Sequence, residues 1–172
     1  MILNLKIVRV DSNYCDYLRQ FDSRVPYNNE NKELRPFVGI LFNVNECEYF
    51  APLSSPKPKH KKMSNGIDFL KIDDGDLGAV NFNNMIPVES SNYWLVDLDR
   101  KYEEISEQKY YILLSKQLEW LDSNYDKVKK KSSKLYQLYI TNKLPNNIKD
   151  RCCNFKLLEE KCALYNEDHI YV

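Results

Sequence analysis

The sequence predicts an α+β fold in which a small curled antiparallel sheet, or a partly closed barrel, is followed by long helices. In the first half of the chain, short apolar runs alternate with turn residues, as in strands joined by hairpins. In the second half, apolar residues recur every three or four positions, as in helices. Strands first and helices second are typical of an α+β domain. The 172 residues are enough for one domain with its own core, and we expect a single domain over residues 1–172.

The strands of the first half are expected in short, separate runs. An apolar run at residues 3–8 predicts the opening strand, and Asp11 or Ser12 can then cap a short helix that reaches Phe21. Prolines and asparagines make residues 22–36 a loop. Further strands are expected at residues 37–44 and 48–53, which form a hairpin, and near residues 67–72, 77–82 and 85–89.

The second half predicts long helices. Apolar side chains with helical spacing run from Tyr110 to Val128, and the same helix continues, or a new one begins, through Tyr139. Pro145 ends this helical region because proline cannot continue a helix. Asn154 is a suitable N-cap for a last helix.

The charge balance excludes a protein that binds nucleic acids over its whole surface. Basic and acidic side chains each number 25, so the formal net charge is zero. A general nucleic-acid binder is usually basic, so any RNA site must be a local patch. Two basic clusters qualify, one at residues 57–62 and one at residues 127–134. The second cluster has the composition of an ordinary solvated face.

Cysteines and apolar runs indicate a cytoplasmic protein without disulfides. The five cysteines include one adjacent pair and no C-x-x-C, which fits neither a disulfide framework nor a zinc ribbon. We therefore expect reduced thiols, no metal and no cofactor. The longest apolar run, residues 37–42, is far too short to span a membrane. The N-terminal residues also lack the uninterrupted apolar core of a signal peptide.

Common catalytic motifs are missing from the sequence, and one loop is the candidate site. The chain contains no phosphate-binding glycine loop, no zinc-protease motif and no serine-hydrolase motif. The segment Ser54–His60 instead combines two hydroxyls, two lysines and an imidazole with two prolines. Charged donors on a stiff loop suit an RNA phosphodiester, because they bind its non-bridging oxygens while RNA brings its own nucleophile, the 2′-hydroxyl. A module that binds RNA without cleaving it can use the same basic loop.

This loop resembles the active-site segment of a known toxin family. In the ToxN/AbiQ family of type III toxins, that segment is similar to residues 50–57 here, Phe-Ala-Pro-Leu-Ser-Ser-Pro-Lys. Other blocks resemble the family in the same order, at residues 14–26, 35–40, 77–87, 116–120 and 153–161. Six blocks in register, spread over nearly the whole chain, make the resemblance specific.

The resemblance implies a fold, an activity and a partner. The fold would be a highly curved, SH3-like partial barrel with added helices, related to the MazF and Kid ribonuclease toxins. The activity would be metal-independent cleavage of A-rich RNA. The partner would be a small repeat RNA that folds as a pseudoknot, is cut from its precursor by the toxin and inhibits it, often in closed rings of protein and RNA. Free toxin would cause growth arrest and abortive phage infection.

The resemblance also implies roles for individual residues. Ser55 would lie at the scissile phosphate and position or activate the 2′-hydroxyl, and Lys57 would bind the phosphate or donate a proton. Arg35 stands where some relatives have lysine, and its role can only be electrostatic because arginine keeps its proton. Tyr14 would contact RNA near the cleavage site, although it also lies on the apolar side of its helix, as a core tyrosine would. Tyr27 would be a second RNA-facing aromatic residue.

Five further side chains would contact RNA. Ser54 would hydrogen-bond the backbone or the RNA, and Lys59 and Lys61 would contact phosphates. His60 would donate a proton or contact a base, since an unperturbed imidazole has a pKa near 6.5. Gln117 would either contact RNA from the long helix or lie on the solvated face of that helix.

Overall fold

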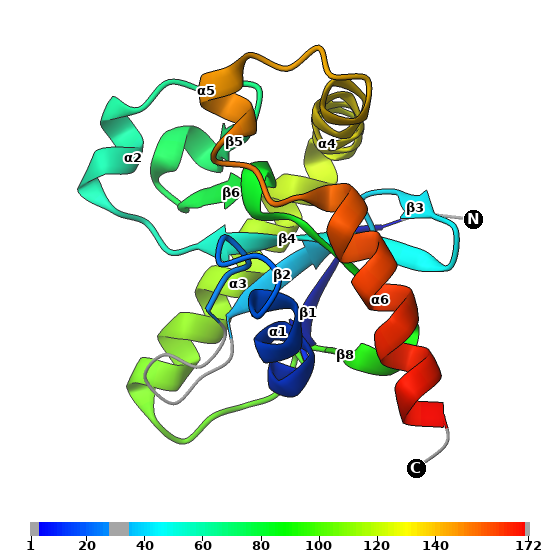
Figure 1. Ribbon diagram of the computed structural model, residues 1–172. Helices are drawn as coiled ribbons and strands as arrows, with labels where there is room; N and C mark the ends of the chain where they lie inside the picture. Colours follow the sequence, from blue (N-terminus) through cyan, green and yellow to red (C-terminus); the bar gives the residue numbers. More distant parts are fainter. Residues whose placement is uncertain (1–3, 28–34, 171–172) are drawn as a thin grey trace.

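An eight-stranded antiparallel sheet forms the centre of the protein (Figure 1). The computed structural model describes residues 4–27 and 35–170, with side chains in these ranges up to Tyr165. The strands are β1 (Lys6–Val10), β2 (Pro36–Gly39), β3 (Asn43–Val44), β4 (Cys47–Ser54), β5 (Phe69–Lys71), β6 (Ala79–Asn81), β7 (Ile86–Val88) and β8 (Tyr93–Leu95). The hydrogen-bonded path runs β5-β6-β4-β2-β1-β8, and β3 and β7 pair with β4 off this path.

Helices lie between and after the strands, and the long ones follow the strands, as predicted. In the described ranges they are α1 (Ser12–Arg19), α2 (Pro58–Lys62), α3 (Ile105–Ser123), α4 (Tyr125–Ile140), α5 (Asn146–Lys149) and α6 (Phe155–Ile170). Both predicted caps are confirmed: the Asp11 carboxylate accepts a hydrogen bond from the Tyr14 N–H (3.0 Å), and Asn154 Oδ1 accepts one from the Leu157 N–H (3.2 Å). A membrane-spanning helix, which must be both long and apolar, does not occur in the described part of the chain.

The strand β4 organises the sheet. It pairs with β2, β3, β6 and β7, and its middle residues Tyr49, Phe50 and Ala51 are completely buried. The rings of Phe42, Tyr136 and Phe155 pack around Tyr49. Two of these rings come from α4 and α6, so both helices pack on β4, the strand that ends at the candidate loop.

The α+β class is confirmed, but the expected curling of the sheet into a partial barrel is wrong. The sheet stays open, since the strands at the two ends of its path, β5 and β8, do not pair with each other within the described residues. Helices cover the apolar surface instead: α6 packs on β7 and β4, and α3 contacts β1. Helices that pack on the apolar face of a sheet remove it from water, so the sheet need not close into a barrel to bury that face.

Two helical predictions need correction. The expectation that residues 54–60 are entirely a stiff loop is wrong, because α2 begins at Pro58, and a proline in the first helical turn has no N–H bond to lose. The long helix predicted from Tyr110 is two helices, which meet at Asn124. The second of them, α4, ends at Ile140, five residues before the proline expected to end it.

The basic cluster on α4 is only partly a solvated face. Lys129 Nζ donates a hydrogen bond to the Ile40 carbonyl (3.1 Å), which ties the helix to the chain beyond β2. Burial lowers the pKa of Lys129 and of Lys131. These two lysines therefore contribute to packing as well as to surface charge.

Candidate active site

The candidate loop begins where β4 ends. Ser54 is the last residue of β4 and pairs with Ala79 of β6, and its Oγ accepts a hydrogen bond from Asn81 Nδ2 (3.2 Å). The chain then leaves the sheet, and residues 55–59 are all exposed. The sheet thus holds one end of the loop while Ser55, the next residue, faces solvent.

Arg35 directly precedes β2. In the next strand pair, Phe37 of β2 lies opposite Pro52, two residues before Ser54 on β4. Arg35 Nε donates a hydrogen bond to the carbonyl of Tyr27 (3.5 Å), whose ring is 51% exposed. Arg35 and Tyr27 are therefore neighbours, just before β2.

The Gln117 side chain supports the loop from beneath. It is 1% exposed, and its Nε2 donates hydrogen bonds to the carbonyls of Leu77 (2.8 Å) and Ser54 (3.3 Å). Neither of the two positions expected for Gln117, in contact with RNA or on a solvated face, is found. The buried amide instead joins helix α3 to the end of β4 and to the segment that precedes β6.

Gly78 allows the loop to approach β6 closely. Its backbone φ is +98°, a value that residues with a Cβ rarely adopt. A Cβ built on Gly78 would lie 1.9 Å from the Ser54 carbonyl oxygen and 3.1 Å from the Ser55 carbonyl carbon. Only glycine can pass beneath the Ser54–Ser55 peptide at this distance.

His60 fixes the other end of the loop. The Lys57 N–H donates to His60 Nδ1 (3.2 Å), and the His60 N–H donates to the Lys57 carbonyl (2.9 Å). The imidazole is 2% exposed and lies beside the Phe69 ring, with 6.0 Å between ring centroids. Burial, together with the positive charges of Lys57 and Lys59, lowers the pKa of His60. His60 is thus a neutral acceptor that shapes the turn around Lys57.

This arrangement predicts a pH dependence of folding stability. The His60–Lys57 hydrogen bond should contribute fully above the ordinary imidazole pKa of about 6.5. The contribution should be lost as the pH falls through the lower pKa of the folded state, because the unfolded chain binds the proton more tightly. His60→Asn keeps an acceptor that does not titrate. We expect the melting temperature of the unsubstituted protein to fall more than that of His60→Asn between about pH 7.5 and about pH 5; equal falls would contradict this role.

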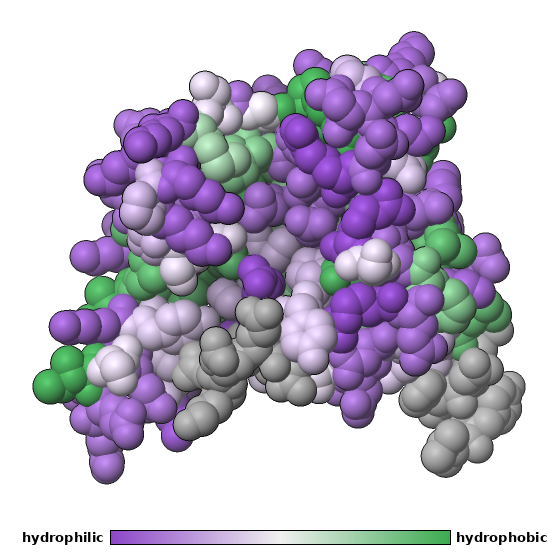
Figure 2. Space-filling view, turned by 60° about the vertical axis from the view of Figure 1, so that its left-hand side comes forward, coloured by the Kyte–Doolittle hydropathy of each residue, from purple (hydrophilic) through white to green (hydrophobic). Residues whose placement is uncertain are grey.

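Lysines surround a hollow beside the loop. The hollow has a volume of about 450 Å³ and is lined by Pro56, Lys57, Pro58, Lys61, Lys62, Gly75 and Asp76. Lys61 Nζ lies 3.0 Å from Asp76 Oδ1, so part of its charge is balanced. Lys57, Lys59 and Lys62 are exposed. Figure 2 shows that the side of the molecule carrying α2 is predominantly hydrophilic and hollowed.

Comparisons with known proteins identify the family. The family model described as Toxin ToxN of type III toxin-antitoxin systems matches residues 6–163. Endoribonuclease ToxN of Bacillus thuringiensis subsp. kurstaki is 34% identical over 168 residues, which cover 95% of this chain and 86% of that protein. Endoribonuclease AbiQ of Lactococcus lactis subsp. lactis is 32% identical and covers 96% of this chain and 91% of that protein. The chain belongs to the ToxN/AbiQ family of endoribonuclease toxins.

Solved structures of ToxN/AbiQ toxins have the same fold. A type III toxin described as selectively inhibited by a non-coding RNA pseudoknot superposes with a TM-score of 0.82 at 33% identity, over 96% of this chain and 99% of that chain. The anti-phage endoribonuclease AbiQ superposes with a TM-score of 0.78 at 28% identity, again over 96% and 99%. The similarity therefore covers the sheet, the loop and the helices together.

Tyr14 lies apart from the loop in this ToxN/AbiQ chain. Its side chain has no exposed surface, and its hydroxyl donates a hydrogen bond to the Pro87 carbonyl of β7. Pro87 pairs with Tyr49, five residues from Ser54 along β4, which corresponds to roughly 17 Å. Tyr14 therefore occupies the core position that its place on the apolar side of the helix allowed. It is not part of the proposed RNA interface.

Gly78 and Asn81 are loop-supporting residues that sequence reasoning did not single out. Both fall in the block at residues 77–82, which attracted attention only through its family resemblance. One signal was present, because Gly78 is one of only four glycines in the chain and lies inside the strand predicted at residues 77–82, where a glycine can mark a close approach of the backbone.

Removal of the Gln117 amide should weaken both stability and RNA cleavage. Gln117→Leu keeps the side-chain volume but removes the donor of two partly buried hydrogen bonds, which costs about 1–3 kcal/mol. Loss of the bond to Ser54 also frees the base of the loop, so the cleavage rate should fall at temperatures where the variant is still folded. Urea unfolding and initial cleavage rates measure the two effects. Gln137→Leu, on the exposed surface of α4, is the matched control, and equal behaviour of the two variants would contradict the supporting role.

Proposed function

We propose that this chain is a sequence-selective, metal-independent endoribonuclease toxin that cleaves A-rich RNA through attack of the 2′-hydroxyl on the adjacent phosphate. The observation that supports this proposal is an exposed Ser55–Lys57 segment held at both ends. Gln117 and Asn81 hold Ser54 on one side, and His60 holds Lys57 on the other. Groups held in place before substrate binds lose little entropy when they act on it.

The chemistry follows from the charges around the loop. The 2′-oxygen forms a bond to phosphorus while the bond from phosphorus to the 5′-oxygen breaks, and a proton leaves the first oxygen and reaches the second. The products are a 2′,3′-cyclic phosphate and a 5′-hydroxyl. Ser55 positions the 2′-hydroxyl, while the Lys57 ammonium and the Arg35 guanidinium stabilise the negative charge that grows on the non-bridging oxygens.

The structure restricts the part that His60 can take. Its Nδ1 atom already accepts the Lys57 N–H, so this nitrogen is not available to remove a proton from the 2′-hydroxyl. We therefore assign His60 to positioning Lys57. Lys59 and the partly neutralised Lys61 are assigned to phosphates of the RNA that flank the cleavage site.

The proposed partner is a small repeat RNA that folds as a pseudoknot. Support comes from the related toxin that is inhibited by such an RNA, and from the related structure described as an antiviral system regulated by a processed non-coding RNA. In this proposal the chain cuts the repeats from their precursor and stays bound to them in the cytoplasm as a closed ring of protein and RNA. It acts in abortive phage infection when released. The exposed lysines of α2 would bind the antitoxin as they bind substrate.

Purified protein incubated with a structured, A-rich RNA in EDTA tests the activity. We expect discrete fragments that end in 2′,3′-cyclic phosphate, identified by mapping both ends of each cut. RNA that stays intact but shifts on a gel, with protein shown to be free of bound RNA, would overturn the proposal in favour of a non-catalytic RNA-binding module. Fragments that appear only after Mg²⁺ is added would overturn the metal-independent mechanism.

A further inference from the structure

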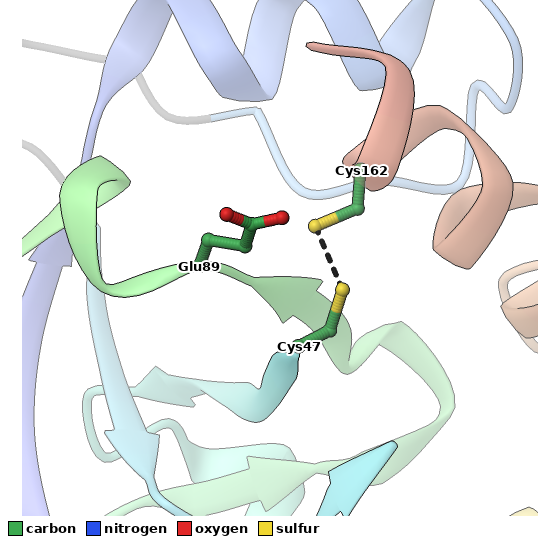
Figure 3. A group of neighbouring side chains, drawn as sticks. All are labelled: Cys47, Glu89 and Cys162. Atoms are coloured by element: carbon green, nitrogen blue, oxygen red, sulfur yellow. Dashed lines mark hydrogen bonds between the residues drawn. The ribbon is translucent and has the colours of Figure 1, made fainter. Parts of the chain in front are cut away.

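Three metal-ligating side chains meet far from the candidate active site. Cys47 begins β4, Glu89 directly follows β7, and Cys162 lies in α6. The two Sγ atoms are 3.0 Å apart, and the ligand atoms of all three residues lie within 4.8 Å of one another. Figure 3 shows the Glu89 carboxylate directed toward both sulfur atoms. Three segments distant in the sequence therefore converge on one point.

The surroundings of this cluster favour a positive ion. Cys47 is 5% exposed and Cys162 is fully buried, while Glu89 is half-buried. A cation held between a carboxylate and two thiolates balances their negative charge at a place where burial limits solvation.

We propose that Cys47, Cys162 and Glu89 form a binding site for a thiophilic divalent cation, with Zn²⁺ as the biological ion. Two thiolates and a carboxylate are a ligand set that zinc accepts, and thiolate sulfur disfavours Mg²⁺ and Ca²⁺. A tetrahedral ion about 2.3 Å from each sulfur needs the sulfurs roughly 3.8 Å apart, so the pair must open by less than about 1 Å. Water can occupy the fourth position on the exposed side of Glu89.

The role of this site is structural. Seven residue steps along β4 separate Cys47 from Ser54, which corresponds to roughly 23 Å. An ion held by Cys47 therefore cannot take part in chemistry at the loop. It would instead fasten α6 to the start of β4 and to the end of β7, and so raise the stability of the whole chain. The proposal is thus independent of the metal-free cleavage mechanism.

Metal titration of the chelator-treated, reduced full-length protein tests the site. Cd²⁺ is the spectroscopic probe, because thiolate ligation produces an ultraviolet charge-transfer band, and Zn²⁺ is the competing ion. We expect one Cd²⁺ per chain, displacement by Zn²⁺, and a melting temperature several degrees higher with Zn²⁺ than with EDTA. No charge-transfer band, or a melting temperature that Zn²⁺ does not change, would overturn the proposal.

Variants separate this site from other thiol chemistry. Cys47→Ser and Cys162→Ser should lose the charge-transfer band, and Cys152→Ser, which removes an equally buried thiol outside the cluster, should keep it. If the first two variants do not fold, Glu89→Gln remains decisive, because its half-exposed side chain can be replaced without a core defect. It should weaken Zn²⁺ binding at least tenfold, a shift typical of a lost ligand. Undiminished affinity in Glu89→Gln, or conversion of the cysteine pair to a disulfide that excludes zinc, would overturn the proposal.

Discussion

Replacement of Ser55 by alanine is expected to lower RNA cleavage by on the order of 100-fold or more, the size of effect seen when a group that stabilises a transition state is removed. The free energy of unfolding should change by less than about 0.5 kcal/mol, because Ser55 is exposed and lies beyond the last paired residue of β4. Initial rates on a labelled A-rich RNA measure the first quantity, and urea unfolding measures the second.

The control for this substitution is an exposed serine elsewhere. Ser106→Ala, near the start of α3, removes the same hydroxyl from a site far along the chain and should leave the cleavage rate unchanged. Full cleavage by a folded Ser55→Ala protein would remove Ser55 from the mechanism. Equal losses in both variants would point to a general effect on the preparation.

Substitution of Gly78 by alanine should destabilise the protein and abolish cleavage together. The new Cβ would lie 1.9 Å from the Ser54 carbonyl oxygen, and the backbone must also keep a φ of +98°. A positive φ with a side chain costs roughly 1–2 kcal/mol, and overpacking adds roughly 1–3 kcal/mol. We therefore expect a loss of about 2–5 kcal/mol in the free energy of unfolding. The remaining folded protein should be inactive because Ser54 and Ser55 have moved.

Gly66→Ala is the matched control for this change. A Cβ on Gly66 would make an ordinary contact, 3.7 Å from Asp68 Oδ1. Its free energy of unfolding and cleavage rate should both stay close to those of the unsubstituted chain. A Gly78→Ala protein with normal stability would show that the Ser54–Ser55 peptide can shift at little cost, and the close approach would then have no role in holding the loop.

The helix caps and most strands could be predicted because they depend on local chemistry. Asp11 and Asn154 satisfy free N–H groups within their own turns, and the apolar runs of the first half mark β1 to β7. The strand β8 was missed because Trp94 and Leu95, two of its three residues, are exposed and leave no alternating pattern. The openness of the sheet depends on how α3 and α6 cover it, which no local pattern encodes.

The loop itself was predictable, and its supports were not. Its hydroxyls, lysines and prolines lie within a few residues of sequence, so the exposed segment at residues 55–59 could be found without knowing the fold. The burial of Gln117 depends instead on which face of α3 meets β4, and a polar side chain on a helix gives no sign that it is the buried one. The Cys47, Glu89 and Cys162 cluster escaped for the same reason, because ligand spacing in sequence detects only sites formed by one or two nearby segments.

The pairing of β4 with four other strands limits how this toxin can be switched off. Ser54 ends β4 and is held by its pairing with Ala79 and by the Asn81 and Gln117 side chains. The sheet therefore fixes the base of the loop. With the base of the loop fixed and Ser55 acting as proposed, we expect inhibition to come from a molecule that covers Ser55 and not from a rearrangement of the strand. When that molecule dissociates or is degraded, activity returns without any refolding of the toxin. The lifetime of the complex between toxin and inhibitor therefore sets the delay before RNA is cut.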